Sequence, residues 1–320
     1  MSGRSLDLSV IVVVYNQAES LKLILRSLLA QDFSGSYEII VTDDGSSPEL
    51  FLTCREDFNK SSIPIKYVWQ QDRHFRAAAA RNNGINISNG KILLFLDGDL
   101  VPALDALRKH VELHTSPKMM VAGNRKWRGE LANAEHLLTK PIKEAIKFLE
   151  DILPVDEKSR QREGVERQRR KQWLASPYPW RACFSSNVSI GWSHEVRFDE
   201  NFIGWGPEDW EFAYRLCMVH GYRPVYNEEI VAYHLESIIS KPLLTGQHED
   251  IVRLLRNTCY FYDKYPTLKL EDVFFWFPRF RLNQHSGQWE VIPRPNSASY
   301  NLEEIVVQVR SWLLENGIYP

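Results

Sequence analysis

The sequence lacks several features that would place it in a specialised class. It has only four cysteines among 320 residues and no C-x-x-C pair, which excludes a zinc-finger pattern and favours free, mostly buried thiols. Its longest strongly apolar run, residues 10–15, is far shorter than the roughly 20 residues that span a bilayer. The sequence has 39 basic and 41 acidic residues. Because basic residues are not in excess, we expect no nucleic-acid partner.

A secretory signal pattern is also lacking, because residues 1–7 are polar and lead directly into an apolar run. We therefore expect a cytoplasmic protein. Peripheral contact with a membrane stays open through two segments, the basic stretch 158–171 and the aromatic run 274–277. For the aromatic run, packing in the core is the favoured interpretation. A hydrophobic content of 44% is enough for a packed globular core.

The first hundred residues alternate between strand and helix patterns. Apolar, β-branched runs predict strands at 8–15, 37–42, 65–69 and 91–96, with helical spacing between them. Such repeated units predict an α/β fold, a mainly parallel sheet flanked by helices. Ligands bind such sheets beyond the carboxyl ends of the strands. Polar residues stand at those ends: Asn16, Asp43, Asp44, Asp97 and Asp99.

The remainder of the chain is less regular. Residues 137–153 read as one amphipathic helix, and helices are also expected near 249–260 and 302–314. Residues 156–171 hold seven Lys or Arg, four Asp or Glu and a single aliphatic residue. Such a segment is expected to be a mobile loop or a solvated helix. A lid, or a contact with an anionic acceptor, is the sharper alternative.

Two carboxylate pairs carry the chemical argument. In Asp97-Gly98-Asp99, carboxylates flank a glycine directly after an apolar strand, an arrangement that can offer oxygen ligands to a divalent cation. In Glu208-Asp209, two acids lie among tryptophans in a Gly- and Pro-containing loop. A hydroxyl nucleophile needs a base within hydrogen-bonding reach, and a carboxylate held there can supply it. A capped helix start is the structural alternative for one of the two acids.

A family resemblance rests on an ordered set of motifs. The motifs are 12–16, 42–46, 75–82, 96–99, 205–212 and His234. The first four resemble the nucleotide-binding half of family-2 glycosyltransferases with the GT-A (Rossmann-like) fold. The others resemble the acceptor half of bacterial chondroitin-polymerase modules, β-1,4-galactosyltransferases and polypeptide N-acetylgalactosaminyltransferases. The resemblance covers roughly residues 8–236 and identifies no particular sugar.

The resemblance implies a donor site for a UDP-sugar. Asp44 would accept a hydrogen bond from the uracil ring, framed by Asn16 and the strand backbone at Val14, with Asp43 as second choice. Arg81 would contact the diphosphate; Arg76, five positions away, lies on another helical face, and a structural role is about as expected for it. The donor-binding residues implied are Val14, Asn16, Asp44, Arg76, Arg81, Asp97, Gly98 and Trp205.

The resemblance also implies a cation, Mn²⁺ or Mg²⁺, that stabilises the departing UDP. Asp99 would ligate it and Asp97 would contact ribose or sugar. His234 would be the second protein ligand, with His248 as the fallback. Asp209 would be the base of an inverting displacement and Glu208 would bind hydroxyl groups.

Some features of the sequence leave alternatives open. Retaining relatives have Glu-Asn at positions 208–209, so Asp209 favours inversion, although a retaining N-acetylgalactosaminyltransferase-like enzyme is the alternative. Pro207 and the run 185–187 depart from the pattern common in the family. The identity of the donor sugar therefore stays open. A nucleotidyltransferase is disfavoured because no Gly-rich loop follows the first strand. A non-catalytic UDP-sugar-binding scaffold is the alternative from another class.

The expected organisation is a GT-A domain over 1–240 and a C-terminal helical extension over 241–320. Within the first, 1–100 would bind nucleotide and 101–240 the acceptor, with a basic insertion near 154–172. The acceptor is a hydroxyl-bearing glycan, lipid-linked sugar, peptide or small molecule.

Overall fold

The computed structural model describes residues 4–128, 134–152, 157–235, 246–293, 295–296 and 300–319. Contacts within the chain divide it into two compact units. The first comprises Met1–Asp199 and Phe212–Ser237, and the second comprises Glu200–Glu211 and Ile238–Pro320. The expected domain boundary at 240 stays a prediction.

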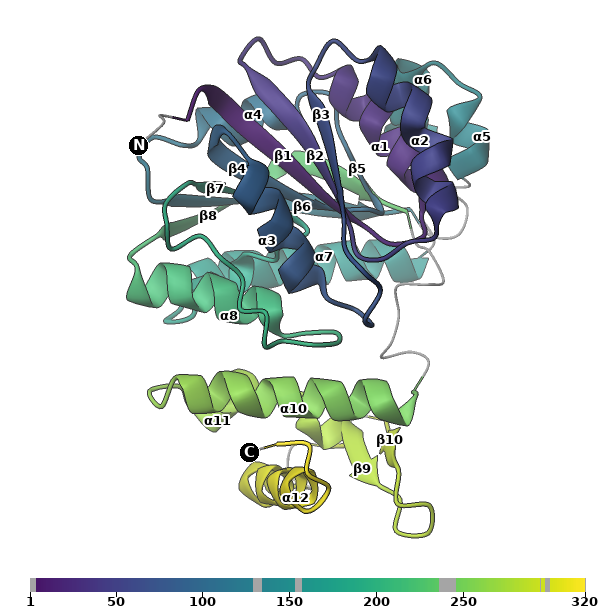
Figure 1. Ribbon diagram of the computed structural model, residues 1–320. Coiled ribbons are helices and arrows are strands. Elements are labelled where there is room, and N and C mark those ends of the chain that lie inside the picture. The colour runs from purple at the N-terminus through teal and green to yellow at the C-terminus, as the bar shows by residue number, and fades with distance from the viewer. Residues whose placement is uncertain are drawn as a thin grey trace. The chain divides into compact units, whose positions relative to one another are not determined.

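The first unit is built on an eight-stranded sheet with the order β3-β2-β1-β4-β7-β6-β8-β5 (Figure 1). Its strands are β1 Leu6–Val14, β2 Tyr37–Asp43, β3 Ile65–Trp69, β4 Gly90–Asp97, β5 Leu100–Pro102, β6 Met119–Trp127, β7 Asn187–Gly191 and β8 Arg223–His234. The first four strands in the sequence pair in parallel, and β6 pairs in parallel with β8, whereas β7 and β5 run antiparallel to their neighbours. The prediction of a mainly parallel sheet is therefore confirmed.

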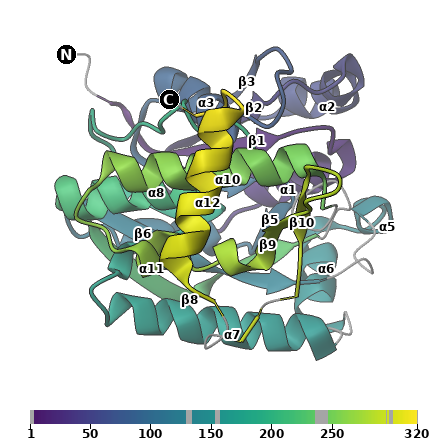
Figure 2. The ribbon, with the colours of Figure 1, turned by 90° about the horizontal axis from the view of Figure 1, so that it is seen from below.

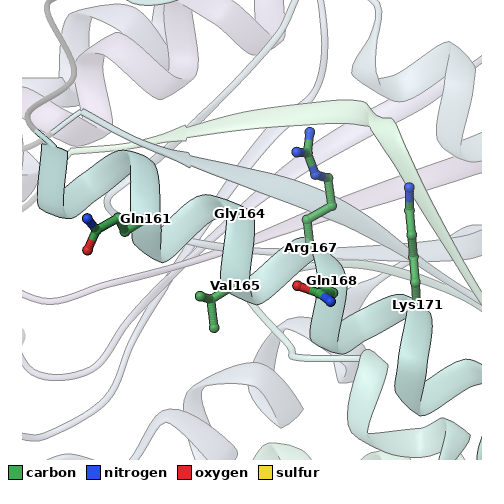
Figure 3. A pocket seen from close by; sticks show the side chains of 6 residues that line it. All are labelled: Gln161, Gly164, Val165, Arg167, Gln168 and Lys171. Carbon is green, nitrogen blue, oxygen red and sulfur yellow. The ribbon is translucent and has the colours of Figure 1, made fainter.

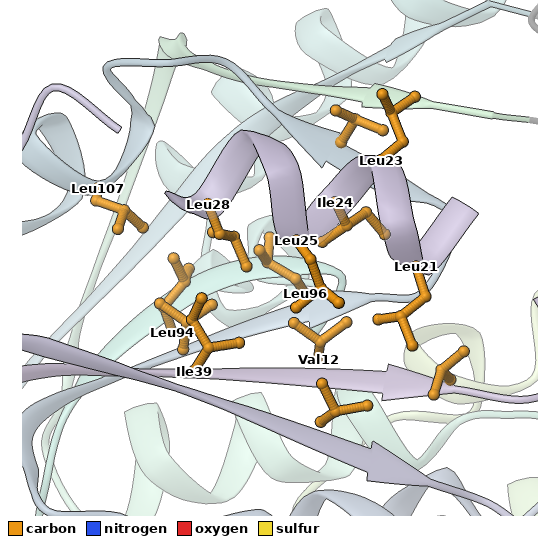
Figure 4. Packing of buried hydrophobic residues seen from close by; sticks show 14 of the residues in the cluster. Val12, Leu21, Leu23, Ile24, Leu25, Leu28, Ile39, Leu94, Leu96 and Leu107 are labelled. Atoms are coloured by element: carbon orange, nitrogen blue, oxygen red, sulfur yellow. The ribbon is translucent and has the colours of Figure 1, made fainter. Parts of the chain in front are cut away.

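Helices cover both faces of this sheet because successive side chains of a strand point to opposite faces. Val10 and Val12 of β1 belong to the hydrophobic cluster that includes the buried face of α1 (Ala18–Leu29), as Figure 4 shows for Val12, Leu21 and Leu25. Ile11 points the other way. A β-carbon at Gly84 of α3 (Ala77–Ile87) would meet Ile11 at 2.6 Å. The absence of a side chain at Gly84 thus permits α3 to pack closely on β1.

Other helices connect the strands of the first unit. They are α2 Pro48–Lys60, α4 Ala106–Glu112, α5 Ala134–Leu138, α6 Ile142–Lys147 and α7 Glu157–Leu174, with a π-helical turn at Phe148–Ile152 and a 3₁₀ turn at Pro179–Ala182. The single amphipathic helix expected at 137–153 is wrong, because the segment is split. Pro141 lies at the start of α6 with ψ 141°, and proline cannot continue a helix from the residues before it.

The sequence allowed either a mobile loop or a solvated helix for the basic stretch, and its described part forms the helix α7. One side of this helix is not exposed to solvent. Arg170 is 1% exposed and donates to the backbone carbonyls of Gly123 in β6 and Ala182. This inward arginine anchors α7 to the sheet.

The second unit is mostly helical. Its elements include α10 His248–Lys264, α11 Leu270–Val273, a 3₁₀ turn at Phe277–Arg279, the hairpin strands β9 Phe280–Leu282 and β10 Trp289–Val291, and α12 Leu302–Glu315. The two units share α8 Glu208–Tyr214, whose first four residues belong to the second unit; a π-helical turn, Arg215–Val219, follows it. Within the second unit α12 crosses α10 (Figure 2). Phe274 and Phe277 are fully buried, so core packing is confirmed for this pair.

Candidate active site

The register of the sheet gathers the predicted residues of the first unit along one edge. Val14 pairs with Asp43 and Val13 pairs with Asp97, so β1, β2 and β4 end side by side. Because β7 runs antiparallel to both β4 and β6, β6 and its parallel neighbour β8 end at the same edge. His234 is the last residue of β8. The carboxyl edge of the sheet is where ligands bind in folds of this class.

The two aspartates after β2 have different partners. Asp43 accepts hydrogen bonds from the backbone N–H groups of Gly45, at 3.1 Å, and Ser46, at 2.7 Å. Its other carboxylate oxygen accepts from the hydroxyl of Tyr67. Asp43 therefore closes the turn, the structural role that turn chemistry gives to an Asp at this position, and Asp44 is left as the candidate for a ligand.

Asp44 is buried and anchors the loop that leads into α3. Its Oδ1 accepts from Nε2 of Gln70 at 2.5 Å, and its Oδ2 accepts from the backbone N–H of Arg76 at 2.7 Å. Burial raises the pKa of Asp44, and these two hydrogen bonds oppose that rise. Each carboxylate oxygen has a further lone pair, so Asp44 can accept another hydrogen bond from a ligand.

Asn16 ties the turn after β1 to the turn after β2. Its backbone N–H donates to Oγ of Ser46 at 2.8 Å, and its side-chain oxygen accepts from the N–H of Ser47 at 3.0 Å. The backbone of Asn16 has φ +50°, a left-handed conformation that asparagine tolerates better than most residues. In addition, the carbonyl of Val14 accepts from the N–H of Asp44 at 3.0 Å. These bonds fix the floor of the predicted base site.

The two predicted arginines are separated by the geometry of α3. Arg81 is buried, and its Nη2 donates to Oδ1 of Asp97 at 3.0 Å. Arg76 occupies the N-cap position of α3 and bonds to Asp44 through its backbone. The expectation that the two side chains lie on different faces of the helix stays a prediction.

Gly98 permits β4 to end very close to β1. A β-carbon at this position would lie 2.8 Å from the carbonyl oxygen of Val13 and 3.1 Å from Cα of Val14. Both are backbone atoms that cannot rotate away. Glycine between the two aspartates therefore lets the loop fold tightly over the end of β1.

Asp99 and His234 form the only acid–imidazole pair that the structure describes at this edge. Nε2 of His234 lies 3.4 Å from Oδ2 of Asp99. Oδ1 of Asp99 is buried and makes no hydrogen bond to any described residue. Burial and the charge of Asp97 raise the pKa of Asp99 to about 7, against the attraction of Arg125.

Three residues that the sequence analysis missed support this pair. The ring of Trp127 lies against that of His234, with centroids 4.1 Å apart, and the guanidinium of Arg125 lies 5.4 Å from the Trp127 ring. Glu166 of α7 accepts three hydrogen bonds from Arg125 at 3.0–3.1 Å. The only signal in the sequence is the spacing of Arg125 and Trp127, which places both side chains on one face of a strand.

The predicted catalytic acids belong to the second unit and are described with it. Glu208 is buried, whereas Asp209 is partly exposed. The backbone N–H groups of Trp210 and Glu211 donate to the carbonyl of Pro207 at 3.1 and 3.0 Å, which starts the helix. Both acids thus lie in the first turn of α8, where negative charge is favoured.

Aromatic rings surround this turn. Trp210 is stacked on Trp276 at 5.0 Å and on Phe275 at 5.4 Å, and Trp205 lies 6.4 Å from Trp276. Trp210 is 6% exposed, so its faces are occupied by other rings, which favours core packing. Trp205 is only half-buried and keeps surface for a ligand.

The fallback cation ligand has another role. Nδ1 of His248 accepts the backbone N–H of Trp289 at 2.8 Å, which joins α10 to β10. Across the described ranges, no cluster of three or more His, Cys, Asp or Glu side chains has the geometry to hold a metal ion. A cation held by Asp99 and His234 would therefore need ligands other than a third His, Cys, Asp or Glu side chain of the described residues.

An open hollow of about 680 Å³ runs along α7 (Figure 3). It is lined by Gln161, Gly164, Val165, Arg167, Gln168 and Lys171. Arg167 and Lys171 both pair with Glu228 of β8, at 3.7 and 3.0 Å. Because these ion pairs neutralise much of the basic charge, we assign no anionic ligand to the hollow. None of the helices in the described ranges is long and apolar enough to cross a membrane.

Sequence comparison finds relatives among synthases and glycosyltransferases. The chain is 30% identical over 244 residues to a hyaluronan synthase of Pasteurella multocida, a match covering 72% of this chain and 24% of the relative. It is 30% identical to an Escherichia coli chondroitin synthase, covering 72% and 34%. A validoxylamine A glucosyltransferase of Streptomyces hygroscopicus subsp. jinggangensis is 28% identical, covering 84% and 63%. The matched part of the chain thus spans between 24% and 63% of the length of these relatives.

Solved structures share the fold at low identity. A mannosyltransferase of Pyrobaculum calidifontis in complex with GDP-Man and Mn²⁺ matches with a TM-score of 0.54 and 16% identity, covering 98% of this chain and 77% of that one. TarS of S. aureus in complex with UDP-GlcNAc matches with a TM-score of 0.51 and 13% identity, covering 97% and 73%. These likenesses confirm the predicted GT-A architecture.

The family model described as glycosyl transferase family 2 matches residues 9–178. This range extends from β1 through α7 and includes the turns after β1, β2 and β4. The resemblance expected from the sequence motifs is therefore confirmed, and the chain belongs to glycosyl transferase family 2.

Proposed function

We propose that this chain transfers a sugar from a UDP-sugar to an acceptor hydroxyl, with a divalent cation, Mn²⁺ or Mg²⁺, and with inversion at the anomeric carbon. Family membership supports sugar transfer. The names of the solved neighbours, which are complexes with GDP-Man and Mn²⁺ or with UDP-GlcNAc, support a nucleotide-sugar donor and a cation.

One observation carries the cation proposal. Oδ1 of Asp99 is buried without a hydrogen-bond partner among the described residues, and Oδ2 lies 3.4 Å from Nε2 of His234. An uncompensated buried carboxylate oxygen is costly, and a cation held by Asp99 and His234 would compensate it. Two protein ligands are few for Mn²⁺ or Mg²⁺, which commonly fill their coordination with substrate phosphates and water. The bound cation would supply charge stabilisation to the diphosphate as it leaves.

The donor would lie along the carboxyl edge of β1, β2 and β4. In this proposal Asp44 accepts the N3–H of uracil, and the backbone at Val14 and Asn16 lies beside the base. Asp97 would contact ribose or sugar while Arg81 holds its carboxylate at 3.0 Å. Arg81 is thereby committed to Asp97, which makes it an organiser of the donor site as well as a candidate for the diphosphate.

The transfer itself would be a single displacement. Asp209 would take the proton from the acceptor hydroxyl as its oxygen attacks the anomeric carbon. The bond from that carbon to the phosphate oxygen breaks on the opposite face, and its electron pair leaves with UDP. Glu208 would orient hydroxyl groups. The greater exposure of Asp209 than of Glu208 supports Asp209 as the acid that meets the acceptor.

The names of the relatives, which include hyaluronan and chondroitin synthases and a validoxylamine A glucosyltransferase, point to no single acceptor for this chain. A polysaccharide, a lipid-linked sugar, a peptide and a small molecule all stay open as the acceptor in this proposal. The cytoplasmic location expected from the sequence stays a prediction.

The experiment is release of nucleoside diphosphate from a panel of UDP-sugars and GDP-mannose, with Mn²⁺ or with EDTA. Glycosyltransferases of this kind can hydrolyse the donor slowly without an acceptor, so the acceptor need not be known. The Asp99→Ala variant is compared with Asp105→Asn, which alters a surface carboxylate paired with Lys109. We expect Mn²⁺-dependent release from one UDP-sugar, lost in Asp99→Ala and kept in Asp105→Asn. Turnover of GDP-mannose alone would overturn the uridine assignment. If the chain shows no turnover and calorimetry detects no UDP binding, the donor site is refuted. UDP binding without turnover of any donor would favour the non-catalytic UDP-sugar-binding scaffold.

A further inference from the structure

Helix α7, rich in basic residues, turns the acidic side chains of Glu163 and Glu166 toward the sheet. Glu166 is 14% exposed at its side chain and bridges two arginines, Arg125 of β6 and Arg170 of its own helix. Burial on its own raises the pKa of Glu166, but the two arginines outweigh it and bring the pKa to about 2. Glu166 is therefore an anion that fixes the position of Arg125.

Arg125 begins a stack that ends at the cation site. Its side chain shares a face of β6 with Trp127, two positions on, and its guanidinium lies 5.4 Å from the Trp127 ring. Trp127 pairs in register with His234 of β8. The two rings lie 4.1 Å apart with 31° between their planes. The far end of the imidazole, Nε2, lies 3.4 Å from Oδ2 of Asp99.

A second acid of α7 strengthens the same support. Glu163 accepts the backbone N–H of Trp127 and pairs with Arg128 at 3.1 Å. The last residues of β6 are therefore held by α7 through both backbone and side chains. A face of His234 is covered by Trp127, so the position of that indole limits how the imidazole can turn.

We propose that Glu166 is a positioning residue for the cation site, which acts through Arg125 and Trp127 to hold the imidazole of His234 toward Asp99. The inference rests on the proposed function, because it takes Asp99 and His234 as the protein ligands. Residues that orient a ligand of a metal commonly change metal affinity by 10–100-fold when they are replaced. Helix α7 would thus be a support of the donor site rather than a lid over it.

The test measures Mn²⁺ affinity directly, without turnover. Metal-free protein is titrated with MnCl₂ by calorimetry in the presence of saturating UDP, and thermal unfolding is recorded for each variant. Glu166→Gln keeps the size of the side chain but removes the charge that fixes Arg125, and Trp127→Leu removes the ring. The matched control is Glu228→Gln, the same chemical change at an acid that also pairs with α7, through Lys171 at 3.0 Å, but on the exposed surface.

We expect Glu166→Gln and Trp127→Leu each to weaken Mn²⁺ binding by about tenfold or more, with Glu228→Gln within twofold of the wild type. If Glu166 and Trp127 act through one stack, the variant that carries both changes should bind Mn²⁺ only slightly more weakly than the weaker of the two single variants. Unchanged affinity in Glu166→Gln, or losses that simply add in the double variant, would overturn the inference. If Glu166→Gln does not fold, Trp127→Leu decides by the same criterion.

The failure of the inference is distinguishable from the failure of the proposed function. A wild-type chain that takes up no Mn²⁺ in the presence of UDP refutes the cation site itself. A wild-type chain that binds Mn²⁺, beside a folded Glu166→Gln variant that binds it equally well, refutes only the positioning role.

Discussion

Nε2 of His234 lies 3.4 Å from Oδ2 of Asp99, and the backbone of the sheet sets this proximity. Leu100 pairs with His234, and the N–H of Leu235 donates to the carbonyl of Asp99 at 2.8 Å. The edge strand β5 begins directly after Asp97-Gly98-Asp99 and pairs with the end of β8, which brings Asp99 next to His234. Residues distant in the sequence become neighbours through strand pairing rather than through flexible loops.

The first prediction concerns base recognition at Asp44. Uracil presents a donor at N3 whereas cytosine presents an acceptor there, so a carboxylate should favour UDP over CDP. Asp44→Asn places an amide, which can also donate, at this position. We expect the ratio of UDP to CDP affinity to fall by about tenfold, since a mismatched buried polar pair costs about 1–3 kcal/mol. Calorimetry with both nucleotides measures it, and an unchanged ratio would argue that Asp44 only anchors Gln70 and Arg76.

The second prediction concerns the base. Asp209→Asn should lower the rate of transfer by about 10²–10⁴-fold, the usual contribution of general base catalysis, with UDP affinity unchanged. Glu249→Gln, an exposed acid paired with Arg253, is the control and should keep full activity. Near-normal transfer by Asp209→Asn, or a product that retains the anomeric configuration of the donor, would refute the inverting role of Asp209.

The third prediction concerns the space at Gly98. Gly98→Ala would put a β-carbon 2.8 Å from the carbonyl oxygen of Val13, so the loop that carries Asp97 and Asp99 must move. We expect UDP binding with Mn²⁺ to weaken by more than tenfold. Gly164→Ala is the control because nothing lies within 4 Å of the added carbon. In the middle of α7 that change should stabilise the fold, by about 0.5–1 kcal/mol. Equal UDP affinity in Gly98→Ala and the wild type would contradict the tight turn.

The fourth prediction concerns stability in acid and rests on His110, which is fully buried. The amide nitrogen of Asn187 donates to the carbonyls of Asn124 and Ile230 at 3.3 Å, so its oxygen accepts from Nε2–H of His110 at 2.9 Å. Nδ1 of His110 lies 2.9 Å from Oγ of Ser189, and in the neutral ring Nδ1 accepts from that hydroxyl. Burial favours this neutral form. Burial lowers the pKa of His110 to about 4, against the opposing effect of Asn187.

The direction of the pH effect follows from this lowered value. Between pH 6.5 and 4 the unfolded chain binds the proton on His110 and the folded chain does not, so stability falls as the pH falls. The loss from His110 is about 2 kcal/mol at pH 5 and is absent above pH 7. Urea unfolding at pH 7.5, 6 and 5 measures it, and His110→Gln should flatten the slope. Parallel slopes in the variant and the wild type would exclude His110 as the cause.

The sequence predicts the regular half of the fold well, because buried parallel strands are continuous apolar runs. The predicted ends of these strands place Asn16, Asp44 and Asp97 at one edge of the sheet, and this prediction needs no information about side-chain contacts. The break at Pro141 could also have been predicted, since proline ends a helical pattern. The prediction of one continuous helix over 137–153 considered only the spacing of apolar residues.

The inward face of α7 could not be read in this way. A segment with abundant charge and almost no aliphatic residues looks solvated, because burial of its charges depends on partners elsewhere. Arg170 is buried, and Glu166 is mostly shielded from solvent, because both side chains have partners on β6: Arg125 for Glu166 and the carbonyl of Gly123 for Arg170. Likewise, nothing local to Trp127 indicates that its ring would pack on His234. Such pairings depend on strand register, which the sequence does not display.

The most direct test of the central claim, a cation-dependent UDP site at Asp99 and His234, is calorimetric titration of the wild-type chain with UDP in Mn²⁺ and in EDTA. We expect UDP to bind in Mn²⁺, EDTA to weaken this binding by tenfold or more, and Asp99→Asn to remove the difference. Equal UDP affinity with and without the metal would rule out a cation-dependent UDP site.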